Sequence, residues 1–79
     1  MTIPRFDTRA LFAALDRQRD ERGLAWQDVA RDTGVAAATI TRTKNGGRLE
    51  VDGMLAMVKW LGLPVEHFVR ESFRPGHPR

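Results

Sequence analysis

Three cations close together in the middle of the chain carry the clearest chemistry in the sequence. Arg42, Lys44 and Arg48 occur in a stretch, Val35 to Leu49, that contains no Asp or Glu. Guanidinium and ammonium groups bind phosphate oxygens, and local charge of one sign concentrates the field where a polyanion docks. A basic run can also be an ordinary solvated surface. The pattern therefore predicts a binding surface for phosphate groups, with solvation of exposed charge as the alternative.

The remainder of the chain is nearly balanced in charge, which makes this stretch stand out. The net charge of the 79 residues is +3. Residues 1–23 hold five Arg against four acids, and residues 51–79 hold four bases against three acids. The sequence thus places its unbalanced positive charge in one central segment.

The stretch 24–47 contains two of these cations and adjoins the third, and it is predicted to form two short helices joined by a tight turn. Val29 supplies the apolar side of the first helix, and Gly34 stands where a glycine can take the left-handed conformation that ends a helix. Ile40 anchors the second helix, and the small Ala30 permits a close crossing. This arrangement is a helix-turn-helix, whose second helix has a solvent face free to enter a DNA major groove.

Apolar spacing and cap signals extend the prediction to five helices in an all-α, compact domain. They are expected from the cap Asp7 to about Arg22, and over 26–33, 37–45, 51–61 and 65–71. Val51 is expected on the inward side of the fourth helix. No alternating strand pattern competes. The resulting organisation is a loose N-terminal arm (1–6), a helix-turn-helix domain (7–72) and a flexible basic tail (73–79).

Several classes of function have no residues to support them. There is no cysteine, Ser72 is the only serine, and His67 and His77 have no further ligand at metal-binding spacing. No glycine-rich phosphate loop is present. We therefore expect no enzyme activity, no cofactor and no metal. The absence of a long apolar run or signal-peptide pattern predicts a cytoplasmic protein without membrane contact, associated with the nucleoid if it binds DNA.

Beyond these patterns, the sequence resembles the Cro/repressor-type helix-turn-helix family, also called the XRE family. The resemblance covers roughly residues 11–68 and implies a lambda-repressor-like, five-helix DNA-binding domain. Such domains usually bind operator DNA as dimers, with the third helix in the major groove. The matching residues are Leu24, Val29, Ala30, Gly34, Val35, Ile40, Asn45 and Gly46, followed by Val51, Met54, Met57, Val58, Leu61 and Gly62.

The resemblance also implies roles for individual residues. The base-reading positions of the family correspond to Ala37, Ala38, Thr41 and Arg42. The phosphate-contacting positions correspond to Trp26, Thr39, Asn45 and Gly46, and we expect Gln27, Lys44 and Arg48 to join them. Alanine can only touch a thymine methyl or allow close approach, so Arg42, bidentate to a guanine, becomes the main candidate for direct readout.

Four aromatic or apolar residues each have two interpretations. Trp26 can contact a phosphate through its indole N–H or pack against the core. Val69 and Phe73, four residues apart, can form one side of a symmetric dimer contact, whereas Phe73 could instead fold back on the first helix. Trp60 can face a partner chain or cover the edge of the core.

The prediction that combines these observations is a sequence-specific DNA-binding transcriptional regulator, more specifically a repressor, acting as a homodimer on double-stranded DNA. Two alternatives remain open. One is a protein-interaction module of the same fold, such as an antitoxin or a polymerase-binding partner, which the two alanines and the modest net charge would suit. The other is a nucleoid-type binder of weak specificity.

Overall fold

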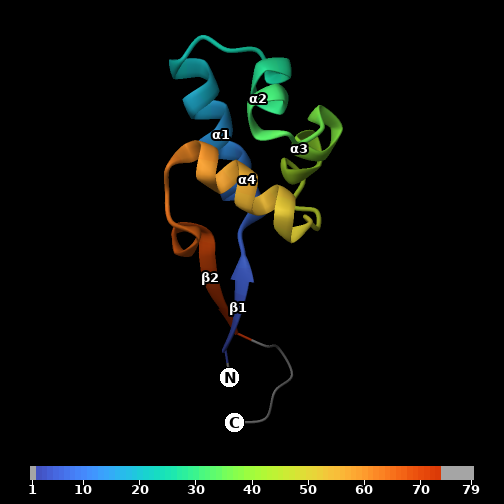
Figure 1. Cartoon of the computed structure of the whole chain (residues 1–79). Coiled ribbons are helices and arrows are strands. Elements are labelled where there is room, and N and C mark those ends of the chain that lie inside the picture. Colours follow the sequence, from blue (N-terminus) through green and yellow to red (C-terminus); the bar gives the residue numbers. More distant parts are fainter. Residues whose placement is uncertain (1, 74–79) are drawn as a thin grey trace.

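Four α-helices, a short 3-10 helix and a two-stranded sheet make up residues 2–73, which are the residues that the computed structural model describes (Figure 1). In chain order the elements are β1 (Thr2–Phe6), α1 (Thr8–Glu21), α2 (Trp26–Thr33), α3 (Ala37–Thr43), α4 (Val51–Leu61), the 3-10 helix η1 (Val65–Phe68) and β2 (Val69–Phe73). A mostly helical architecture is therefore confirmed, whereas the expected count of five helices is wrong.

The helix limits follow from local signals in the sequence. Asp7 caps α1, because its Oδ1 accepts a hydrogen bond from the backbone N–H of Ala10 at 2.9 Å. Gly34 ends α2 with a left-handed φ of 76°, and Gly62 ends α4 in the same way. The predicted limits of α2 and α4 are confirmed. Helix α3 stops at Thr43, two residues earlier than expected, because the chain turns over residues 44–46.

The N-terminal arm and the expected fifth helix together form a β-ribbon instead. Strand β1 pairs antiparallel with β2, from Thr2 opposite Phe73 to Phe6 opposite Val69. The backbone N–H of Asp7 donates to the carbonyl of Phe68 at 2.8 Å and fixes the base of the ribbon. Figure 1 shows β1 and β2 side by side, extending away from the helices. Only Val65–Phe68 keep a helical turn, because the residues that follow are taken up by pairing with β1.

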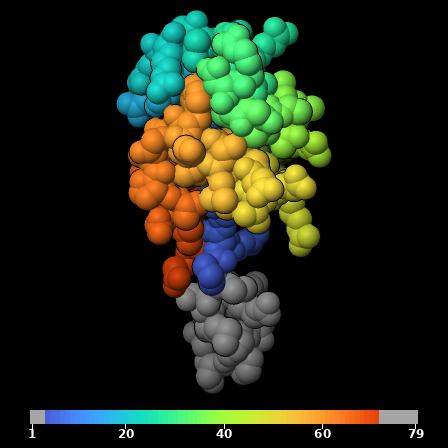
Figure 2. Space-filling model, viewed as in Figure 1, coloured from blue at the N-terminus to red at the C-terminus, as the bar shows by residue number. Residues whose placement is uncertain are grey.

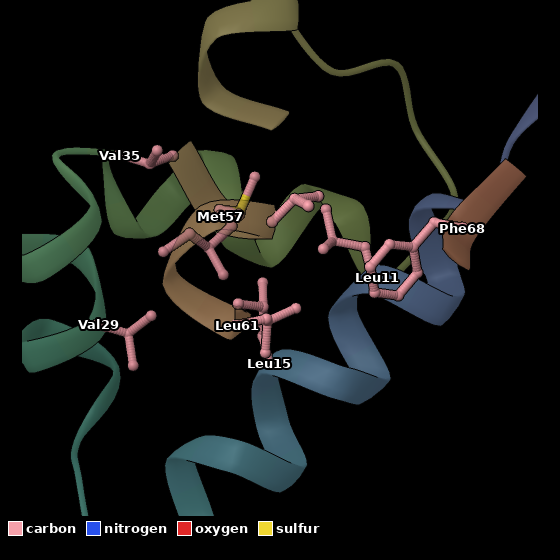
Figure 3. Close-up of a cluster of buried hydrophobic side chains, with 9 residues drawn as sticks. Leu11, Leu15, Val29, Val35, Met57, Leu61 and Phe68 are labelled. Carbon is pink, nitrogen blue, oxygen red and sulfur yellow. The ribbon is translucent and has the colours of Figure 1, made fainter. Parts of the chain in front are cut away.

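The core lies where α1, α2, α3 and α4 meet, closed at one end by η1. Figure 3 shows apolar side chains from these elements converging on one space, among them Leu11, Leu15, Val29 and Phe68, each at most 1% exposed. Val51 is the exception to the expected inward stripe of α4, since it is 63% exposed. It belongs to the first turn of α4, and the buried cluster from that helix begins further along, at Met57, Val58 and Leu61.

Candidate nucleic-acid interface

Helix α3 owes its orientation to two buried residues on its inner side. Ile40 and Thr43 are each 1% exposed, and the hydroxyl of Thr43 is satisfied by donating to the carbonyl of Ile40 at 2.6 Å. The opposite side must then face solvent. The exposed Asn45 lies just past the helix, in the turn over residues 44–46. Within the helix, three exposed residues at helical spacing form this side: Ala38, Thr41 and Arg42. We call this set the outward stripe.

Two further residues of α3 that are assigned to base or phosphate contact lie along the flanks of the outward stripe. Ala37 is exposed at the start of α3, and Thr39 is half-buried on the flank toward α4. Thr41 donates its hydroxyl hydrogen to the carbonyl of Ala37 at 3.0 Å, which leaves its oxygen lone pairs outward. Arg42 Nη2 lies 3.4 Å from Thr39 Oγ1, a weak contact within the helix. Helix α3 therefore presents an exposed surface of small and basic side chains. Figure 2 shows α3, in green, beside α4, in yellow to orange.

The central cations are exposed but are not remote from acids in space. Within the part of the chain that is described, Arg42, Lys44 and Arg48 form no ion pair at 4.0 Å or less. Arg42 and Arg48 nevertheless line an open hollow of about 490 Å³ between α3 and α4, together with Glu50 and Asp52. The segment that is free of acids in sequence thus has acids on one flank. A polyanion is favoured on the outward stripe and on the side of α3 away from α4.

Trp26 is held by packing at the start of α2. Its ring is half-buried and stacks on Phe12, with ring centroids 5.1 Å apart and an interplanar angle of 18°. The guanidinium of Arg19 covers the ring at 5.0 Å. These contacts favour the packing interpretation of Trp26, and a phosphate contact stays a prediction. Gln27, the next residue, is exposed.

The same helix start shows how α2 tolerates an alanine cap. Ala25 occupies the N-cap position and has no side-chain acceptor. Asp28 compensates directly, since its Oδ2 accepts a hydrogen bond from the backbone N–H of Ala25 at 2.9 Å. Its carboxylate is also paired with Arg31 at 3.2 Å.

Arg9 belongs to this surface although no pattern in the sequence indicates it. It lies on α1, far from α3 in sequence, yet its Nη2 donates to the backbone carbonyl of Asn45 at 3.3 Å. Gly46 makes room for it, because a Cβ at that position would lie 2.8 Å from Arg9 Nε. Charge counted along the chain places Arg9 in a balanced segment and therefore misses it.

The residues proposed for dimer contact lie on α4 and β2, away from α3 in the sequence. Trp60 is half-buried against the core, and the guanidinium of Arg22 covers its ring at 4.7 Å. Val69 is 37% exposed on β2, opposite Phe6. The backbone of Phe73 pairs with Thr2, while its side chain lies outside the described part of the structure, as does all of His77. His67 is exposed, edge-on to Phe68.

Comparison with known proteins identifies no relative of this chain. The chain matches no protein-family model, no curated protein and no solved structure. No helix within residues 2–73 combines the length and apolar character needed to cross a membrane. The function must accordingly be inferred from the outward stripe of α3 and the cations around it.

Proposed function

We propose that the protein is a DNA-binding transcriptional regulator, acting as a repressor, in which α2 and α3 form a helix-turn-helix. Helix α3 would enter the major groove of double-stranded DNA. The observation that carries the proposal is the outward stripe of α3, which is exposed, free of acids and followed by Lys44 and Arg48. Ala37 and Ala38 allow the helix backbone to approach base edges closely. Such a regulator would work in the cytoplasm, on the nucleoid.

Each exposed group has a role in this proposal. Arg42 would form two hydrogen bonds with a guanine, while Ala37 and Ala38 touch thymine methyl groups and Thr41 contacts a base edge. Phosphate contacts would come from the flanks of α3 and position the helix without reading sequence. The residues proposed for these contacts are Gln27, Thr39, Lys44, Asn45, Gly46 and Arg48, with Trp26 as a further candidate.

Two copies would be needed for tight, specific binding, because one short helix reads only a few base pairs. A homodimer on a two-fold symmetric operator meets that need. The exposed Val69 on β2 supports a contact near the ribbon, whereas Trp60 is already covered by Arg22.

Selection of bound sequences from a random duplex pool tests the proposal. The expected result is an enriched site with two-fold symmetry, whose two half-sites lie about 10 base pairs apart or a multiple of that spacing. Affinity for the selected duplex should fall steeply between about 50 and 200 mM NaCl, because bound cations displace counterions from the DNA. Absence of binding even at the lowest salt concentration would exclude DNA binding. Equal affinity for every sequence would leave a weakly specific, nucleoid-type binder.

A second candidate function, a protein-interaction module, is favoured by one observation. Val51 and Leu55 are 63% and 49% exposed, one turn apart on α4, and the acids Glu50 and Asp52 lie beside them. Such an apolar patch beside acids suits a protein partner better than DNA. Failure of DNA binding in the experiment above, with the fold intact by circular dichroism, would favour this function.

A further inference from the structure

Three arginines from separate parts of the chain line one groove at the base of the β-ribbon. Arg5 lies on β1, Arg9 on α1 and Arg70 on β2, and they surround an open groove of about 390 Å³. The other residues along it are Phe6, Asp7, Thr8 and Gly46. Three positive charges and one negative charge therefore meet here, which gives the groove an excess of two positive charges. We call it the arginine groove.

The strand register makes this concentration of charge unfavourable for folding. Arg5 and Arg70 are direct partners across the ribbon, so both side chains project from the same face. Like charges in that relation destabilise a strand pair. Arg70 is partly neutralised by Asp7, whose Oδ2 lies 3.5 Å from Arg70 Nε. The guanidinium of Arg5 makes no hydrogen bond or ion pair with any residue between 2 and 73 for which contacts are described. An anion placed between the arginines would remove the repulsion.

Arg9 connects the arginine groove to the end of α3. Its guanidinium is fixed against the loop by the hydrogen bond to the carbonyl of Asn45. A second, adjoining groove of about 210 Å³ shares Arg5, Phe6, Thr8 and Gly46 and continues past Gly47 to Arg48. A cationic path therefore runs from the ribbon to Arg48, in the loop that follows α3.

We propose that the arginine groove binds a phosphodiester group of the DNA backbone, with Arg5 and Arg9 as its ligands. This inference rests on the proposed function, because it extends the same interface beyond α3. DNA backbone is favoured over a free phosphate ion by the open shape and by the continuous path to Arg48, which suits a chain of phosphates. Guanidinium groups provide the donors in both cases.

The test compares two variants in the groove with one outside it. Arg5→Glu gives Arg70 an opposite charge across the ribbon, and Arg9→Gln removes the charge at Gly46. The control Arg17→Gln removes one exposed charge from α1, where Arg17 is paired with Glu21, and this pair lies outside the groove. Each protein is titrated with a short random duplex between about 50 and 200 mM NaCl. Thermal melting is measured in parallel.

Expected results for Arg5→Glu separate binding from folding. Its melting temperature should equal or exceed that of the parent, because an attractive pair replaces a repulsive one. Its affinity for DNA should nevertheless fall several-fold, and the slope of log K against log salt should become shallower by about 0.9 for the lost contact. Arg9→Gln should show a similar change in slope, and Arg17→Gln should keep the parental slope.

Two outcomes would overturn the inference without touching the proposed function. One is a parent that binds DNA while both groove variants keep its slope. The other combines two results. Sodium phosphate, at matched ionic strength, raises the melting temperature of the parent but not of Arg5→Glu, while the two proteins have equal salt slopes for DNA binding. The groove would then hold free phosphate. A parent that does not bind duplex at the lowest salt would overturn both proposals.

Discussion

The guanidinium of Arg9 lies against Gly46 and donates a hydrogen bond from Nη2 to the carbonyl of Asn45 at 3.3 Å. Gly46 has a φ of +76°, and its lack of a Cβ permits both this left-handed backbone conformation and the close approach of the Arg9 side chain. This contact joins the start of α1 to the loop that ends α3. It holds a cation of one helix beside the proposed DNA-binding surface of another.

Replacement of Gly46 by Ala should therefore have two separable effects. The left-handed backbone should lower the free energy of unfolding by about 1–2 kcal/mol. The new Cβ, 2.8 Å from Arg9 Nε, should also displace the guanidinium and weaken DNA binding. Gly23→Ala is the matched control, since Gly23 has a φ of +68° and a Cβ added there would meet no other residue's atoms within 4 Å. Urea unfolding should show comparable losses for both variants, and a gel shift should show weaker binding only for Gly46→Ala. Equal DNA affinity of the two variants would contradict a role for Arg9.

Arg42 and Lys44 should differ in what their loss does to sequence preference. Arg42 is on the outward stripe of α3, and Lys44 follows the helix on its flank. Arg42→Ala should cost roughly 1–3 kcal/mol on the selected operator and relax the preference at one base pair. Lys44→Ala should weaken binding to all sequences uniformly and reduce the salt slope by about 1. Binding to operator variants with single substitutions checks both. A parental base preference in Arg42→Ala would remove Arg42 from the set of base-reading residues.

Trp26 offers a test between its two interpretations, because Phe can replace its packing but not its N–H. Trp26 stacks on Phe12 under the guanidinium of Arg19. Trp26→Phe should keep most of the stack and cost less than about 1.5 kcal/mol of stability. If packing is the whole role, the DNA affinity of the folded protein stays at the parental value, which is the result we expect. A fall in affinity with little change in the melting temperature would establish a phosphate contact through the indole N–H.

The parts of the fold that were predictable are those decided by local signals. Helix α2 begins and ends where its apolar spacing and Gly34 indicate, and α4 ends at Gly62 for the same reason. The β-ribbon depends on pairing between residues from opposite ends of the chain, such as Thr2 and Phe73, which no local pattern reports. Strand β1 contains Pro4, which is tolerated because a two-stranded ribbon has only edge strands.

The candidate site likewise has a part that local signals predict and a part that depends on contacts between distant segments. Burial of Ile40 and exposure of Ala38, Thr41 and Arg42 follow from the helical period, so the outward side of α3 was predictable. The contribution of Arg9 and the proximity of Glu50 and Asp52 to α3 depend on how distant segments fold together. Charge along the sequence gives no information on such neighbours.

Asp7 performs two functions that different substitutions can separate. Its Oδ1 caps α1 at Ala10, and its Oδ2 pairs with Arg70 in the arginine groove. Asp7→Ser keeps a capping oxygen but removes the only carboxylate among the described residues that line that groove. The ion pair is half exposed, so Asp7→Ser should stay within about 1 kcal/mol of the parent in urea unfolding. Asp7→Ala should lose roughly 1 kcal/mol more, because the cap is also gone.

The same two substitutions should change DNA binding in the direction opposite to their effect on stability, so that binding becomes tighter. Removal of the Asp7 carboxylate takes away the acid that faces Arg5, Arg9 and Arg70 along the groove, so a DNA phosphate should meet less repulsion and more available cation. Both Asp7→Ser and Asp7→Ala should therefore bind a random duplex more tightly than the parent at low salt, although neither is more stable. Fluorescence anisotropy at several salt concentrations measures this difference. Unchanged or weaker binding in Asp7→Ser, with its fold intact, would show that no phosphate approaches the arginine groove.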